Sequence, residues 1–166
     1  MPTPILRKAT EADVPTITEI YNDVIATSTA IYRDDTVDVA ERMAWFRTRV
    51  GDGFPVIVAE LDGKVIGYTG YGSFRFGEGY KRTVEHTIHI HSAHRRKGLG
   101  RILLTEIMRV AKEDGRHVLV GGIDSENVGS IALHEKFGFE VTARMPEVAF
   151  KGGKLLTLVL MQKILD

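Results

Sequence analysis

Apolar residues recur at the spacing of one helix face in four stretches of this chain, a pattern that predicts four amphipathic helices. Thr10 and Asp13 form a weak capping pattern before the first stretch, and Asp38 and Asn127 are placed to cap two others. Glycines follow the last three stretches, as is common where helices end. The predicted helices cover residues 14–24, 38–50, 99–111 and 127–137.

Runs rich in β-branched residues predict strands between these helices. Asp62-Gly63 is a strong hairpin signal between residues 56–61 and 64–71. In residues 83–91 apolar and polar side chains alternate, so Val84 and Glu85 are expected on opposite faces of a strand. Further strands are expected at 118–123, 140–150 and 155–161, after a short apolar segment at residues 5–6. This order of elements predicts a mixed α/β (α+β) domain.

The composition limits the classes of function. The 166 residues show no repeat or linker, so we expect one domain spanning residues 1–166. Because 22 Lys and Arg balance 22 Asp and Glu, nucleic acid and anionic membranes are disfavoured as partners. The absence of cysteine excludes disulfides and thiol nucleophiles. No apolar run approaches the roughly 20 residues of a membrane span, and residues 1–4 are unlike a signal peptide, so we expect a cytoplasmic protein.

A basic turn with two glycines, residues 95–101, lies between the strand at 83–91 and the helix at 99–111. Unpaired N–H groups at a helix start, together with the helix dipole, suit a pyrophosphate. The turn lacks the Lys-Ser/Thr of a P-loop, and Leu103 stands where the dinucleotide motif needs a small residue, so ATP and NAD are poor candidates. The alternative interpretation is an ordinary basic turn, because short glycine motifs often match by chance.

The order strand, basic glycine turn, long helix, strand, Asn127, helix and Phe137-Gly138-Phe139 resembles the acetyl-CoA site of the GNAT N-acetyltransferase superfamily. The resemblance runs nearly end to end and is closest to the branch that acts on phosphinothricin and methionine sulfoximine. The segments that carry it are residues 20–23, 44–46, 83–86, 98–100, 131–134 and 160–162. It implies a GNAT fold with a mixed, mostly antiparallel and splayed central sheet, acetyl-CoA between the strands at 83–91 and 118–123, and a homodimer.

The resemblance also implies which residues bind acetyl-CoA. Backbone groups of the strand at 83–91 would pair with the pantetheine arm, as a peptide pairs with an open sheet edge. The glycine turn would bind the pyrophosphate, and Asn127 would bond the pantetheine near the thioester, although a plain helix cap is its alternative role. The expected acetyl-CoA residues are Ile88, His89, Ile90, Arg96, Lys97, Gly98, Leu99, Gly100, Arg101 and Asn127.

Two residues are candidates for catalysis. An amine must lose a proton before it attacks a thioester, so a base is required, and Glu85 in the matching Thr-Val-Glu-His context is the candidate, directly or through water. The alternative is a carboxylate paired with a neighbouring arginine. His134 stands where many GNAT members carry Tyr, and it is the candidate acid that returns a proton to the CoA thiolate. Its alternative is a satisfied or solvent-facing histidine.

Acceptor recognition is expected from the loop before Glu85, where Arg75 would grip an anionic group between two aromatic walls. The alternative is a surface loop whose aromatics shield the sheet. The expected acceptor residues are Phe74, Arg75, Phe76, Gly77, Glu85, His86 and Thr87. The chain departs from the branch at Phe74, where Trp is usual, at Lys81, where Arg is usual, and at 152–157, where the branch has Phe-Gly-Arg-Trp-Leu-Asp, so the acceptor is less defined than the donor.

We expect no metal, because His86 faces away from His89 and His91 and no carboxylate cluster completes a site. The expected function is direct transfer of acetyl from acetyl-CoA to the α-amine of a small amino-acid-like acceptor such as phosphinothricin, methionine sulfoximine or methionine sulfone, with detoxification as a candidate purpose. Two alternatives stay open: acetylation of a peptide N-terminus or another small amine, and a CoA-binding sensor without catalysis.

Overall fold

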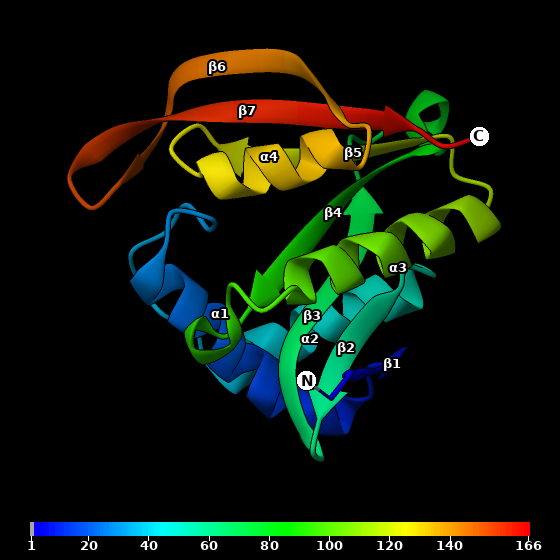
Figure 1. The fold of residues 1–166 in the computed structure, drawn as a ribbon, viewed down its shortest axis with the longest axis vertical. Coiled ribbons are helices and arrows are strands. Elements are labelled where there is room, and N and C mark those ends of the chain that lie inside the picture. Colours follow the sequence, from blue (N-terminus) through cyan, green and yellow to red (C-terminus); the bar gives the residue numbers. More distant parts are fainter. Residues whose placement is uncertain (1) are drawn as a thin grey trace.

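The computed structural model describes residues 2–166, which form a seven-stranded mixed sheet with four α-helices around it (Figure 1). The strands are β1 (Ile5–Lys8), β2 (Val56–Leu61), β3 (Lys64–Ser73), β4 (Thr83–Ile90), β5 (Val118–Asp124), β6 (Glu140–Lys151) and β7 (Lys154–Ile164). The helices are α1 (Val14–Thr27), α2 (Val39–Gly51), α3 (Leu99–Glu113) and α4 (Val128–Lys136), with 3₁₀ turns η1 (Glu11–Asp13), η2 (Glu78–Tyr80) and η3 (Ser92–His94).

The sheet splits in its middle. Its order is β1-β2-β3-β4-β5-β7-β6, and every neighbouring pair is antiparallel except β4 and β5. The parallel pairing of these two strands extends only from Thr83↔Val118 to His86↔Gly121. Beyond it, β4 continues to Ile90 without a strand on its β5 side. The expected splay of the central strands is therefore confirmed.

Buried apolar residues form hydrophobic cores on both faces of the sheet. Along β2, Val56 and Val58 pack in the core beneath α1 and α2, whereas Ile57 packs in the core beneath α3. This division follows from the alternation of side chains along a strand. Glu85 projects from β4 toward the α1 and α2 side, and its neighbours in the chain project toward the α3 and α4 side. The two faces of β4 therefore serve different parts of the site.

The elements agree with the sequence-based predictions within a few residues. Asp38 caps α2 by accepting a hydrogen bond from the N–H of Glu41, and Asn127 caps α4 in the same way from Ser130. Thr10 and Asp13 form a capping box, but it opens the η1 turn, and α1 follows directly. The strand expected at 83–91 ends at Ile90, because His91 turns the backbone into η3.

Candidate active site

A cavity of about 660 Å³ opens where β4 and β5 separate. Its walls come from the segment after α1, the free part of β4, the start of α3 and the start of α4. Of the residues expected to bind acetyl-CoA, those that line it are Ile88, His89, Ile90, Arg96, Gly98, Gly100, Arg101 and Asn127. A smaller cavity of about 90 Å³ at the fork is also lined by Ile88, His89, Asn127 and His134. The fold thus gathers most of these residues in one cleft.

The turn before α3 has the geometry of an anion site. Arg96 and Gly98 have φ angles of 59° and 84°, so the backbone is left-handed on both sides of Lys97 and enters the helix abruptly. The first N–H groups of α3 have no partner within the helix, and Arg96 and Arg101 line the cavity beside them. Free N–H groups, the helix dipole and two guanidiniums fit the pyrophosphate of acetyl-CoA.

Two residues of this turn direct their side chains away from the cleft. Lys97 Nζ donates a hydrogen bond to the carbonyl oxygen of Ala93 at 3.1 Å. Leu99 is 4% exposed and packs in a small core with Ile66 and Leu103. A ligand in the cleft would therefore meet Lys97 and Leu99 through their backbone groups.

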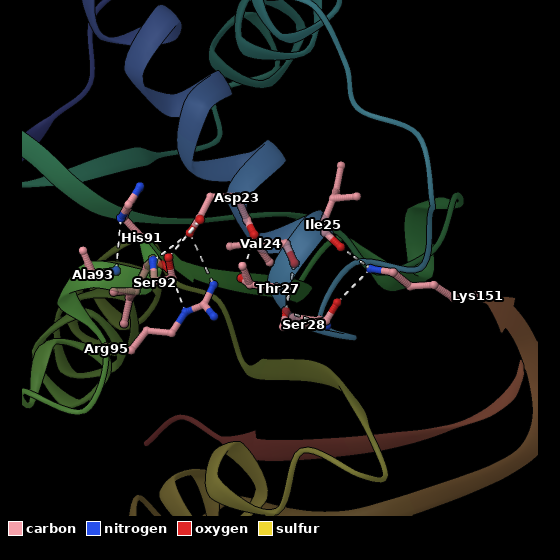
Figure 2. Close-up of polar contacts among 12 residues, drawn as sticks. Asp23, Val24, Ile25, Thr27, Ser28, His91, Ser92, Ala93, Arg95 and Lys151 are labelled. Carbon is pink, nitrogen blue, oxygen red and sulfur yellow. Dashed lines mark hydrogen bonds and ion pairs between the residues drawn. The ribbon is translucent and has the colours of Figure 1, made fainter. Parts of the chain in front are cut away.

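The segment before the glycine turn is tied to α1 by Asp23 (Figure 2). Its carboxylate accepts hydrogen bonds from the N–H of Ser92 at 2.6 Å and from Ser92 Oγ at 2.9 Å. Arg95 lies 3.7 Å from the same carboxylate and donates from Nε to the carbonyl oxygen of Ile90. Burial alone would raise the pKa of Asp23, but the two bonds from Ser92 lower it overall. Asp23 thus holds the end of β4 and the start of the turn together.

Glu85 lies on β4 in partial burial, opposite Gly72 of β3. Burial raises the pKa of its carboxyl above the ordinary value, and the charge of Arg49 opposes this shift. Within residues 2–166 the carboxylate has no hydrogen bond or ion-pair partner. Its Oε1 atom points toward β5, where a Cβ on Gly122 would lie only 3.0 Å away. An unpaired carboxylate of raised pKa at the fork has the properties of a general base.

His134 and His86 form a buried pair on the opposite face of β4. Their Nε2 atoms lie 2.9 Å apart, and each residue is 4% exposed. His134 Nδ1 lies 2.7 Å from the carbonyl oxygen of Ser130, which can only accept, so His134 carries its proton on Nδ1. In the neutral pair the proton between the rings must then belong to His86, which donates to His134 Nε2. His86 Nδ1 has no partner within the described residues.

This arrangement bears on the expected role of His134 as an acid. Burial lowers the pKa of both rings, for His86 to about 3, with the neighbouring His134 adding to the effect. At neutral pH His134 Nε2 therefore accepts a hydrogen bond and has no proton to give. A proton can reach the CoA thiolate from this pair only after His134 takes up a second one. The acid role stays a prediction with that requirement attached.

The expected acceptor loop follows β3 and leads into β4, at the end of the sheet where β4 and β5 are paired. Phe74, Arg75 and Phe76 line a separate cavity of about 330 Å³, and Phe76 is fully exposed. The Arg75 guanidinium stands 5.7 Å from the ring of Tyr80. Thr87 is exposed on β4. Within one chain, the loop and the cleft between β4 and β5 share no lining residue.

Several residues at the site were not predicted from the sequence. Asp124, 3% exposed at the end of β5, accepts hydrogen bonds from Thr29 Oγ1 and Tyr32 OH, both at 2.8 Å, and so fixes the segment after α1 against the sheet. Asp23 fixes the glycine turn in the same manner. Each partner is far away in the chain, so no local pattern marks these carboxylates. Among the residues that line the cleft, Asn127 is the one whose structural hydrogen bond, the cap of α4, was predicted from the sequence.

Two features are absent from residues 2–166. No three side chains of His, Asp or Glu converge in a way that could hold a metal ion. In the same range, no helix is long and apolar enough to cross a membrane.

Comparison with known proteins identifies the family. Residues 17–139 match the model of the acetyltransferase (GNAT) family. The chain is 47% identical over 161 residues to an L-methionine sulfoximine/L-methionine sulfone acetyltransferase of Salmonella typhimurium, covering 97% of this chain and 94% of that protein. It is 33% identical to a phosphinothricin N-acetyltransferase of Alcaligenes faecalis, covering 97% and 82%.

A solved structure shows the same fold. It is that of yncA from Salmonella typhimurium with its cofactor acetyl-CoA, which superposes with a TM-score of 0.94 at 45% identity over 99% of this chain and 95% of that one. The resemblance on which the sequence-based expectations rest is thereby confirmed. The chain belongs to the GNAT acetyltransferase family.

Proposed function

We propose that this protein transfers the acetyl group of acetyl-CoA to the α-amine of a small amino-acid-like acceptor, such as methionine sulfoximine, methionine sulfone or phosphinothricin. The observation that carries the proposal is the cleft where β4 and β5 separate, with an anion site at the start of α3 and with the unpaired Glu85 on the paired part of β4 just before the separation. The names of the Salmonella typhimurium and Alcaligenes faecalis relatives support the acceptor class.

The cleft accounts for binding of the donor. The pyrophosphate would bind the N-terminus of α3 with Arg96 and Arg101, and the two amides of the pantetheine arm would pair with the free edge of β4 between Thr87 and Ile90. Asn127 lines both cavities, but its Oδ1 already accepts from Ser130 N–H. Its amide NH₂ group is therefore the part that would donate to the ligand.

The chemistry that we propose needs no covalent enzyme intermediate. Glu85 takes a proton from the acceptor's ammonium group, and the neutral amine attacks the thioester carbonyl carbon. The C–S bond then breaks, the thiolate leaves with the electron pair and takes up a proton, and the new amide nitrogen loses its second proton. Backbone N–H groups of β4 near Ile88 would stabilise the negative charge on the carbonyl oxygen during this step.

We also propose that the protein works in the cytoplasm as a homodimer. Phe76 is fully exposed, and the β6–β7 hairpin carries apolar side chains at least 40% exposed, including Met145, Phe150 and Leu155. A partner that covered these residues would bury apolar surface and supply a further wall to the loop at Arg75. Sedimentation of the purified protein tests this, and a monomer at micromolar concentration would contradict it.

The experiment that tests the function is a thiol-release assay with acetyl-CoA. Phosphinothricin, methionine sulfoximine, methionine sulfone, common amino acids, a short peptide and simple amines are compared side by side. We expect turnover with the first three. Preference for the peptide would mean that the acceptor is a peptide N-terminus and not a small amino acid. Binding of acetyl-CoA without turnover of any amine would indicate a sensor.

A further inference from the structure

Beside Glu85, on the same face of the sheet, lie two arginines that the sequence-based reasoning did not use. Both come from α2, and neither has a carboxylate within 4.0 Å among residues 2–166. We propose that Arg49, with Arg42 behind it, binds the α-carboxylate of the acceptor, an inference that rests on the function proposed above.

The position of Arg49 follows from the pairing of β3 and β4. Gly72 is directly opposite Glu85, and paired residues of an antiparallel sheet project to the same face with Cβ atoms about 4.5–5.5 Å apart. The Arg49 guanidinium occupies the place that a Gly72 side chain would fill. The guanidinium therefore stands next to the Glu85 side chain, and the missing side chain at Gly72 leaves room for it there.

Arg42 is more deeply buried, at 7% exposure, and lies between the rings of Tyr21 and Trp45, with Cζ 3.9 Å and 3.8 Å from their centroids. Its Nε is buried without a hydrogen-bond partner in the described residues. Arg49 Cζ lies 5.6 Å from the same Trp45 ring. One indole thus holds two guanidiniums near each other. Cation–π contacts retain these charges but do not neutralise them.

Two neighbouring guanidiniums without a counter-ion leave a local excess of positive charge. Burial and the charge of Arg42 lower the pKa of Arg49, and the negative charges of Glu85 and Asp52 oppose this shift. Glu85 does not close an ion pair with it, so the N–H donors of Arg49 stay available and Glu85 stays unpaired. An anion bound to Arg49 would satisfy these donors. It would also leave the proposed base free to act.

The geometry selects the α-carboxylate as that anion. In an α-amino acid the amine and the carboxylate are attached to one carbon, so an amine at Glu85 places the carboxylate beside Glu85 as well. Arg49 is the guanidinium whose charge lowers the pKa of Glu85, whereas Arg75 belongs to the loop after β3 and stands near the ring of Tyr80. Arg75 is then left for the other end of the acceptor side chain.

The test compares acceptors with and without the carboxylate. Methionine sulfone and its decarboxylated analogue, 3-(methylsulfonyl)propylamine, are assayed with the wild type and with Arg49→Met. We expect kcat/KM for methionine sulfone to fall by about 10- to 100-fold, the range of charge-assisted hydrogen bonds, and kcat/KM for the analogue to change little. Arg49→Lys should recover part of the loss. Arg47→Met is the matched control, because Arg47 is an exposed residue of the same helix paired with Glu11.

The other outcomes decide against the inference. An equal loss for both acceptors in Arg49→Met would mean a purely structural role. The preference for methionine sulfone over its decarboxylated analogue could instead be lost in Arg75→Met and retained in Arg49→Met. This result would mean that Arg75, not Arg49, binds the α-carboxylate. Calorimetric titration of methionine sulfone in the presence of CoA makes the test independent of turnover. Binding by the wild type that Arg49→Met weakens at least tenfold supports the site, and unaltered or absent binding overturns it.

Discussion

At the scale of single residues, the two faces of β4 divide the chemistry. Glu85 projects toward the arginines of α2, while His86 projects toward His134 of α4. Partial burial raises the pKa of the carboxyl, and full burial lowers the pKa of the imidazole to about 3. Both shifts oppose the charged form of the group. Burial thus favours the neutral form of both Glu85 and His86, which means a higher pKa for the carboxyl and a lower pKa for the imidazole.

The raised pKa of Glu85 predicts an acidic limb in the activity. The base works only when deprotonated, so kcat/KM should fall as the pH drops through a pKa above the ordinary carboxyl value of 4.5. Glu85→Gln should lower kcat by about 100-fold or more, the scale of a general base, and should remove this limb. Acetyl-CoA affinity serves as the control and should change little. Unaltered turnover in Glu85→Gln would remove the residue from this role.

The histidine pair predicts a fixed tautomer. Because Ser130 O accepts from His134 Nδ1, nitrogen NMR of labelled imidazoles at pH 8 should show the Nδ1–H form of His134 and the Nε2–H form of His86, and the His86 ring should not titrate between pH 8 and 6. His86→Leu removes the donor to His134 Nε2, but the Nδ1–H form of His134 should persist, because Ser130 O still accepts from it. A shift of His134 to the Nε2–H form in this variant would show that His86, not Ser130, sets the tautomer. A charged pair at pH 7 would contradict this assignment.

At the scale of elements, local signals predicted much and long-range contacts were missed. The 3.6-residue periodicity located all four helices, and Asn127 and Asp38 cap as their side chains suggested, because these bonds span a few residues of chain. The bond from Ser92 to Asp23 joins residues 69 apart, and that between His86 and His134 joins residues 48 apart. No local spacing encodes such approaches. Arg42 and Arg49 carry no local signal either, because their place beside Glu85 depends on how α2 packs on β3.

The bond network of Asp23 predicts a selective loss of donor binding. Asp23→Asn keeps one acceptor oxygen but removes the charge that holds Ser92 and Arg95. We expect the Kd of acetyl-CoA to rise by about tenfold, equivalent to about 1.4 kcal/mol, while the KM of the acceptor changes little. Calorimetric titration measures this, with the exposed Asp35→Asn as control. An equal loss in both variants would show that general charge is responsible.

At the scale of the whole molecule, the end of the β6–β7 hairpin is fastened to the segment after α1 (Figures 1 and 2). Lys151 Nζ donates to the carbonyl oxygens of Ile25, Ser28 and Ile31 at 2.7–2.8 Å, which uses all three of its N–H groups. Burial lowers the pKa of this amine. Residues 28–30 line the acetyl-CoA cleft, so the last hairpin of the chain supports a wall built by its first helix.

Lys151→Met should therefore act on both stability and binding. Three carbonyls at the end of α1 would lose their donor, and we expect the free energy of unfolding to fall by about 1–3 kcal/mol. The Kd of acetyl-CoA should rise by a few-fold because Ser28 and its neighbours are released. Denaturant unfolding and calorimetry measure the two effects. Lys154→Met, which removes only an exposed pair with Glu126, is the control and should stay within about 0.5 kcal/mol of the wild type.

If acetyl-CoA binds as proposed, the separation of β4 from β5 would make the donor molecule a component of the sheet itself. The polar main-chain atoms of β4 that point across the gap would then acquire amide partners from pantetheine. Bound acetyl-CoA would therefore raise the free energy of unfolding, because only the native chain offers that strand edge. Inside a cell, the stability of this fold would then depend on the concentration of acetyl-CoA.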